Sequence, residues 1–137
     1  AVNLNPALTS IKYYSNTVRY DNIYASNCLL KSKTYTNATT AFADAVTATC
    51  ISANPAGSSA AAPSSTEAIV YWDVSGGSTL NGILNEGQHA DIAIAYKSAD
   101  RPGALDNVKA EVIVPTGSAL TVERQVPSVT TTVVDLG

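Results

Sequence analysis

Hydrophobic and polar positions alternate along the second half of the chain, which is the spacing of β-strands with one buried face. In residues 90–98, "ADIAIAYKS", the side chains of Ile92, Ile94 and Tyr96 fall on one face. Similar short runs occur at 68–74, 108–114, 119–126 and 127–136, and less regular extended stretches precede them at 11–20 and 22–36. Turn residues separate these runs. The pattern predicts an all-β fold, an antiparallel β-sandwich of about seven or more strands.

The clearest local pairing joins residues 108–114 to residues 119–126. The connection between them, "PTGS", contains Pro115, whose fixed φ suits the start of a turn, and Gly117, which suits its end. We therefore expect these two segments to form an antiparallel hairpin.

The first half contains two segments without strand periodicity. In residues 37–50 the side chains of Phe42, Ala45 and Val46 would share one helical face, but the run is short and rich in Thr. Helix and irregular structure both remain open there. Residues 51–67 are of low complexity and predict a long exposed loop, a surface insertion in a single domain that covers residues 1–137.

The composition narrows the class of protein. Of the 137 residues, 45% are hydrophobic and only 14% are charged, against about a quarter charged in typical domains. A net charge of −3 without a basic stripe argues against a nucleic-acid partner. The chain contains no Met and no apolar run long enough to span a bilayer. We therefore expect a processed or excised product whose targeting or anchoring segment lay upstream of Ala1.

The two cysteines, Cys28 and Cys50, lack the spacing of a zinc site, and the chain has a single His. Outside the cytosol such a pair predicts a disulfide, which for a loop of this length contributes roughly 3 kcal/mol. Two buried free cysteines are the alternative.

Groups suited to catalysis are few. His89 is the only imidazole, and a catalytic triad would need Asp91 or Asp73 behind it and a Ser that no G-x-S-x-G turn selects. We expect His89 in an exposed loop. The carboxylates in or beside the connecting loops show no spacing that favours a catalytic pair: Asp73, Glu86, Asp91, Asp100 and Asp106. The sequence therefore predicts a protein that is not an enzyme.

One connection could hold a hard cation. The stretch "DVSGGSTLNGILNE" offers oxygen donors from Asp73, Ser75, Asn81 and Glu86, the ligand type that calcium or magnesium takes. An ordinary turn, in which Asp and Asn side chains bond the local backbone, is the simpler interpretation. We expect no required cofactor, and a structural divalent cation is the one candidate.

Two further features concern the surface. Asn37-Ala38-Thr39 is an N-glycosylation sequon, which in a secreted protein marks an exposed Asn. Several aromatic side chains could serve as ligand platforms, although core packing is the simpler role, above all for Trp72. They are Tyr13, Tyr14, Tyr20, Tyr24 and Trp72.

Arg124 interrupts the apolar face of its segment. In "LTVERQVP" the side chains of Leu120, Val122 and Val126 share one face, and Arg124 falls among them. Such an Arg can pair with a buried carboxylate, extend to the rim of the sandwich, or face a surface that this chain does not supply.

Residues 108–137 resemble the C-terminal segment of archaellins, the flagellin-like subunits of archaeal motility filaments. The shared pattern is a strand, a Pro-x-Gly turn, a strand that ends with Arg, then Pro, and a final strand that ends in an acidic or polar residue and Leu. The matching positions are Pro115, Gly117, Leu120, Val122, Arg124, Pro127, Val133, Val134, Asp135 and Leu136. Residues 84–96 and 1–15 are similar to the family more weakly, and residues 28–66 do not align with it.

The resemblance implies an immunoglobulin-like β-sandwich, commonly N-glycosylated and in some members holding a metal ion. Archaellins have an N-terminal hydrophobic helix that forms the filament core. This chain would lack it and would be the outer domain of a filament subunit. Its partners would be copies of itself in a helical filament on the archaeal cell surface. Membrane contact would be made only through the missing helix, before assembly.

The resemblance also gives Arg124 a role. It would lie at the rim of the sandwich and pair with an acidic group of the helix layer or of a neighbouring subunit, with a salt bridge inside the domain as the alternative. Two other functions fit the sequence. One is a secreted carbohydrate- or surface-binding module, and the other is a pilin-like adhesive filament subunit.

Overall fold

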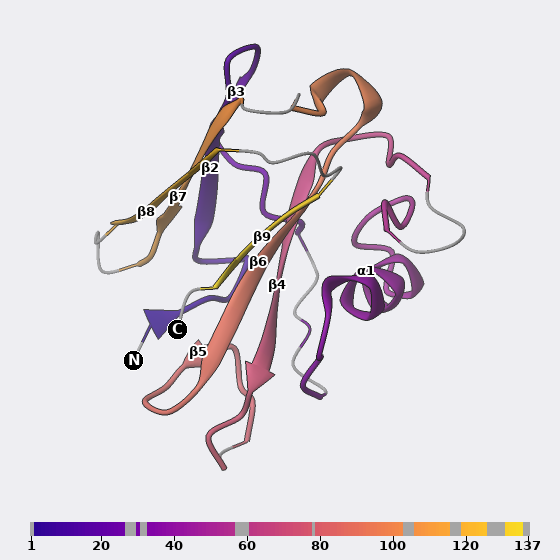
Figure 1. Cartoon of the computed structure of the whole chain (residues 1–137). Coiled ribbons are helices and arrows are strands. Elements are labelled where there is room, and N and C mark those ends of the chain that lie inside the picture. The colour runs from indigo at the N-terminus through magenta and orange to yellow at the C-terminus, as the bar shows by residue number, and fades with distance from the viewer. Residues whose placement is uncertain are drawn as a thin grey trace.

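The computed structural model describes residues 2–26, 30, 33–56, 61–77, 79–102, 106–115, 119–125 and 131–135, and from residue 119 onward it describes the backbone only. Figure 1 shows its elements in chain order. They are β1 (Val2–Asn3), β2 (Ser10–Tyr14), β3 (Arg19–Tyr20), α1 (Ala38–Thr47), β4 (Glu67–Val74), β5 (Ile83–Leu84), β6 (His89–Ala95), the 3-10 turn η1 (Ser98–Asp100), β7 (Asn107–Ile113), β8 (Ala119–Gln125) and β9 (Thr131–Asp135).

Two antiparallel sheets form most of the molecule. One has the strand order β3-β2-β7-β8 and the other the order β4-β6-β9, while β1 and β5 form a separate short pair. Every pairing between these strands is antiparallel. The predominantly β, antiparallel class predicted from the alternation is therefore confirmed, and so is the hairpin, because β7 pairs with β8 over its whole length.

The two sheets face each other across one apolar core, as their positions in Figure 1 indicate. Ile11 and Tyr13 of β2 and Val112 of β7 belong to the same buried cluster as Trp72 of β4 and Ile92 of β6. These residues recur at every second position along their strands, so a single face of each strand supplies the core. The predicted core role of Trp72 is correct, since its side chain is fully buried.

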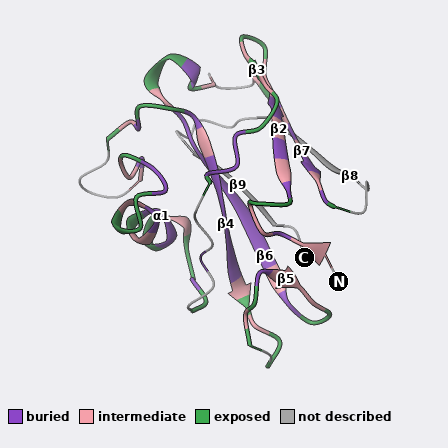
Figure 2. Cartoon of the chain, turned by 180° about the vertical axis from the view of Figure 1, so that it is seen from behind, coloured by how far each residue is buried: buried purple, intermediate pink, exposed green. Residues whose placement is uncertain are grey.

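A second apolar cluster lies on the other face of the β4-β6-β9 sheet, beneath α1. Ile69 and Tyr71 of β4 join Ala41, Phe42 and Ala45 of the helix in this cluster. Because both faces of β4 are covered, its sequence "AIVYW" is continuously apolar instead of alternating. Figure 2 shows the consequence, with β4 and β6 largely buried and the outer side of α1 exposed.

The helix resolves the segment that the sequence left open. Asn37 is its N-cap, and the Asn37 side-chain oxygen accepts hydrogen bonds from the Thr40 N–H at 2.9 Å and the Thr40 hydroxyl at 3.0 Å. At the other end, the Cys50 N–H bonds the carbonyl of Ala45 at 2.8 Å, which closes the Schellman arrangement. Thr49 occupies the left-handed position there with φ of 61°.

The prediction of an exposed loop over residues 51–67 is only partly correct. Its described residues, 51–56 and 61–66, contain no helix or strand, and β4 begins at Glu67. However, four of its side chains are buried, not exposed: Ile51, Pro55, Pro63 and Thr66. Ile51 packs into the cluster beneath α1, and the Thr66 hydroxyl bonds a buried carboxylate. This connection is therefore anchored at both ends to the domain.

One edge of the three-stranded sheet is covered. Single parallel bridges join Tyr24 to Ala68 and Leu30 to Tyr71, and the Tyr35 N–H bonds the Trp72 carbonyl at 2.9 Å. The chain before α1 thus runs beside β4. Among the described residues no helix is long and apolar enough to cross a membrane.

Candidate functional site

The C-terminal segment forms the outer strands of both sheets. After the β7-β8 hairpin the chain changes sheets, so that β9 pairs with β6 instead of β8. Within the described part of the chain, β8 pairs with β7 alone and β9 with β6 alone. Each sheet therefore presents one strand edge that this segment supplies, which makes these edges the candidate interaction surface.

The structure describes only some of the residues of the C-terminal pattern. Pro115 is exposed in the turn that follows β7. Leu120 and Val122 stand in β8 at the register positions opposite Val112 and Ala110. Three others lie outside the described residues: Gly117, Pro127 and Leu136.

Arg124 occupies a core-facing register position in β8. It is paired with Val108 of β7, and Val108 is 5% exposed and part of the core between the sheets. Residues directly opposite each other in an antiparallel pair share a face. The apolar face predicted for residues 120–126 is therefore the face on which Arg124 stands.

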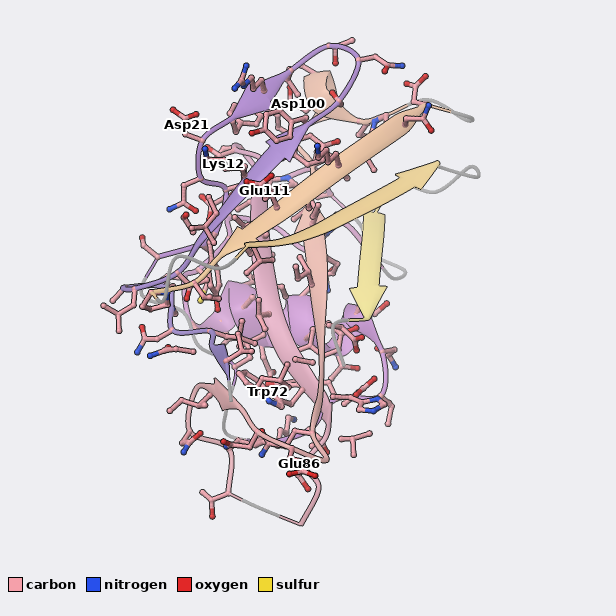
Figure 3. All side chains as sticks on the ribbon, turned by 90° about the vertical axis from the view of Figure 1, so that its left-hand side faces the viewer. Lys12, Asp21, Trp72, Glu86, Asp100 and Glu111 are labelled. Atoms are coloured by element: carbon pink, nitrogen blue, oxygen red, sulfur yellow. The ribbon has the colours of Figure 1, made fainter. Side chains whose placement is uncertain are left out.

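The loop proposed for a cation lies at one end of the molecule, where Figure 3 shows Glu86 below Trp72. The turn that contains Ser75 meets the turn that contains Glu86, since a Cβ added to Gly76 would lie 2.7 Å from the carbonyl oxygen of Gly87. Asn81 uses its side-chain oxygen to accept from the Ile83 N–H at 3.1 Å, as in an ordinary turn.

Asp73 belongs to a group of polar residues at the same end of the β4-β6-β9 sheet. Burial, together with the carboxylates of Asp91 and Asp73, raises the pKa of Tyr71 to about 12. His89, expected in an exposed loop, is instead the half-buried first residue of β6, because Val74 pairs with it across a bulge. Among the described side chains, no group of three or more His, Cys, Asp or Glu residues is arranged to hold a metal ion.

One of the five carboxylates named from the sequence, Asp100, is buried at the opposite end of the molecule, where Figure 3 labels it. Asp100 is 3% exposed, and its Oδ2 accepts from the Tyr20 hydroxyl at 2.5 Å and the Thr66 hydroxyl at 2.6 Å. The Thr66 oxygen in turn accepts from the Lys97 N–H at 3.1 Å. This network joins β3, the start of β4 and η1, and its hydroxyl donors satisfy the carboxylate internally.

The predicted sequon lies at the N-terminus of α1. Asn37 is exposed, and the hydrogen bonds that cap the helix use only its side-chain oxygen. The side-chain nitrogen, which is the atom that carries an N-linked glycan, is not used by the cap. The capping signal was present in the sequence, since an Asn directly before a short periodic run marks a helix start.

The structure describes one of the two cysteines. Cys50, which follows α1, is disulfide-bonded and 7% exposed. Cys28, its predicted partner, lies outside the described residues. Cys50 belongs to the apolar cluster beneath the helix, which packs the C-terminal end of α1 against the β4-β6-β9 sheet.

Most of the candidate aromatic platforms are internal. Tyr13, Tyr24 and Trp72 are buried in the core, and Tyr20 uses its hydroxyl to bond Asp100. Tyr14 differs, because it lies on the outer face of β2, where the Arg19 guanidinium is 5.1 Å from its ring centre.

No protein-family model matches this sequence, and no curated protein matches it either.

Proposed function

We propose that this chain is the outer, immunoglobulin-like β-sandwich domain of an archaellin, a structural subunit of the extracellular archaeal motility filament. In this role it catalyses no reaction. Its partners are copies of itself, whose outer domains contact one another and form the filament surface. An N-glycan on Asn37 would then project from that surface.

The observation that carries this proposal is the path of the C-terminal segment. The archaellin pattern requires a strand, a turn that begins with Pro, a second strand that contains Arg, and a final strand. The chain follows this order in β7, Pro115, β8 and β9. The change of sheet between β8 and β9 gives each sheet one of the last two strands, and the two facing sheets support the immunoglobulin-like architecture.

The strand edges suit self-association. A helical filament is built by heterologous contacts, in which one surface of a subunit meets a different surface of the next. Strand edges present unpaired backbone donors and acceptors that can take part in such contacts. The two edges formed by the C-terminal segment belong to different sheets, so they offer two distinct surfaces.

The described polar clusters fit a structural role better than a catalytic one. The Asp100 carboxylate is satisfied by the hydroxyls of Tyr20 and Thr66, and burial beside two carboxylates raises the pKa of Tyr71 to about 12, which disfavours its phenolate form. These arrangements stabilise the fold and leave no activated nucleophile.

The test is the coding sequence directly upstream of Ala1. A short basic leader followed by roughly 20 or more apolar residues with helical spacing supports a filament subunit. A conventional secretory signal with a small-residue cleavage site near Ala1 contradicts it and favours a secreted carbohydrate- or surface-binding module. If the helix is present, deletion of the gene separates the two filament types. Loss of swimming supports the proposal, whereas loss of attachment with normal swimming indicates a pilin-like adhesive filament.

A further inference from the structure

The outer face of the four-stranded sheet has a hollow beside the β2-β3 turn. Its volume is about 360 Å³, and it is lined by Tyr14, Ser15, Asn16, Asn107, Val108 and Lys109. Tyr14 and Lys109 are register partners on neighbouring strands, so the paired ends of β2 and β7 form one wall and the turn forms the other. This volume lies within the range of small-molecule sites, which begins near 300 Å³.

The lining combines apolar surface with uncharged hydrogen-bonding groups. The Tyr14 ring supplies the apolar part, since the Val108 side chain belongs to the core between the sheets. Asn107 offers a carbonyl acceptor and two N–H donors, and Asn16, which donates one N–H to Asp106, offers its carbonyl. The Ser15 oxygen accepts from the Thr17 and Val18 N–H groups at 3.2 Å, so Ser15 offers its O–H as a donor. A ligand that matches this set carries neighbouring hydroxyl groups on a compact ring with an apolar C–H face.

The charges around the hollow are mixed. The Arg19 guanidinium and the Lys109 ammonium lie 5.1 Å and 5.8 Å from the Tyr14 ring centre. The Asp106 carboxylate accepts from the Asn16 side chain at 3.4 Å. Because both signs are present, the site does not select for a charged ligand.

We propose that this hollow binds one ring of a neutral saccharide, with the sugar hydroxyls held by Asn16, Asn107 and Ser15 and the C–H face against Tyr14. The described lining of this site contains no residue of β8 or β9, the strands that carry the proposed filament contacts, so the inference stands or fails independently of that function.

The second described hollow is less suited to a sugar. It lies beside the C-terminal end of α1, has a volume of about 430 Å³ and is lined by Val46, Thr49, Cys50, Ile51, Ser52, Ser64, Ser65 and Glu67. It contains no aromatic ring, and burial raises the pKa of its one carboxyl group, Glu67. It therefore provides an internal comparison for the same experiment.

The experiment is a titration of the full chain, labelled with ¹⁵N, with glucose, galactose, mannose, N-acetylglucosamine and glucuronate, followed by amide chemical shifts. The expected result is saturable binding of at least one neutral sugar, with the largest shifts at residues 14–16 and 107–109. Glucuronate should bind no more tightly than the matching neutral sugar. Shifts confined to residues 49–52 and 64–67, or tighter binding of glucuronate, or no saturable shift with any sugar, would overturn the proposal.

Variants then assign the site. Asn107→Ala should weaken binding about tenfold, since one or two hydrogen bonds are lost, and Tyr14→Ala should weaken it at least as much. Lys12→Ala is the matched control, because Lys12 lies on the same face of β2 next to Glu111, outside the hollow (Figure 3). Asn107 is exposed at the start of β7, so its truncation should leave the fold intact. Equal affinity of the Asn107→Ala variant and the wild-type chain would contradict the assignment.

Discussion

Tyr20 and Asp100 are 80 residues apart in sequence, and a 2.5 Å hydrogen bond from the Tyr20 hydroxyl to the Asp100 carboxylate joins them. The carboxylate is almost completely buried, and Thr66 provides a second donor to the same oxygen. The bond fastens the short β2-β3 hairpin, in one sheet, to the turn that leaves β6, in the other. The network therefore closes one end of the domain.

Removal of one hydroxyl from this network should destabilise the fold. Thr66→Val keeps the shape of the side chain but leaves Asp100 with one donor fewer and the Lys97 N–H without its acceptor. We expect the free energy of unfolding to fall by about 1 to 3 kcal/mol, measured by urea denaturation. Thr17→Val, at an exposed position of the β2-β3 turn, is the control. Equal stability of the two variants would show that the network contributes little.

Ionisation of Tyr71 should lower the free energy of unfolding at alkaline pH. Its pKa is raised to about 12 by burial and by Asp91 and Asp73, whereas an unfolded Tyr loses its proton near pH 10. Between these values the unfolded chain binds fewer protons than the folded chain. The stabilisation is therefore complete below about pH 10 and is lost as the pH rises toward about 12, by roughly 1 to 3 kcal/mol.

Urea titrations from about pH 8 to about pH 11 measure this loss. Tyr71→Phe should reduce the slope without abolishing it, because burial also raises the pKa of Tyr13 and of Tyr24, and Tyr14→Phe on the outer face serves as the control. An unchanged slope in the Tyr71 variant would be inconsistent with this explanation.

The two roles of Asn37 can be separated. Asn37→Asp should keep the helix cap and remove the glycan, and Thr39→Ala should remove the sequon while the cap remains. Asn37→Ala loses both and should reduce stability by about 1 kcal/mol. Intact mass of the protein from its native source reports the glycan, and thermal unfolding reports the cap. Full stability of the Asn37→Ala variant would argue against a capping contribution.

Thr49 holds a conformation that suits Gly. A β-branched residue with φ of 61° is strained, and Gly is the usual residue at this position of a Schellman motif. Thr49→Gly should therefore raise the free energy of unfolding by about 1 kcal/mol. Thr47→Gly, inside the helix, should lower it and provides the contrast. A destabilised Thr49→Gly variant would mean that the Thr side chain makes a compensating contact.

Arg124 distinguishes an assembly role from an internal ion pair. If its partner belongs to a neighbouring subunit, as the proposed function suggests, Arg124→Leu should leave the stability of this domain within about 1 kcal/mol and prevent filament assembly by the full-length subunit. If its partner is a buried carboxylate of this domain, the same change should destabilise it by about 3 to 5 kcal/mol. Arg101→Leu, at an exposed position, is the control for both measurements.

Local pattern was sufficient for the longer strands of the second half of the chain, although not for the two-residue strand β5. Residues 108–114 and 119–126 show clear alternation, and the structure pairs 107–113 with 119–125. The sequence left the helix undecided, because the Thr content of residues 37–50 obscured its periodicity. Asn37 nevertheless carried a capping signal. β4 was recognised as a strand, but its continuous apolar run reflects a second buried face, which only the placement of α1 reveals.

The polar networks could not be predicted in the same way. Tyr20, Thr66 and Asp100 occupy unremarkable loop and strand-end positions, and no local spacing relates them. They meet because three separate connections converge at one end of the sheets. For the candidate cation ligands, closeness in sequence suggested closeness of function. Asn81 is close to the others in sequence, yet its side chain serves its own turn.

The two edges of the β4-β6-β9 sheet differ, because another part of the chain is bridged to the β4 edge and β9 forms the opposite edge. Tyr24, Leu30 and Tyr35 contact the backbone of β4 along one edge, while β9, as far as the structure describes the chain, ends the sheet on the other side. Any strand added to this sheet would therefore join on the β9 side only. If the strand that joins there came from a different edge of the neighbouring copy, such as its β8 edge, the contact would be heterologous and the row of subunits would have a polarity.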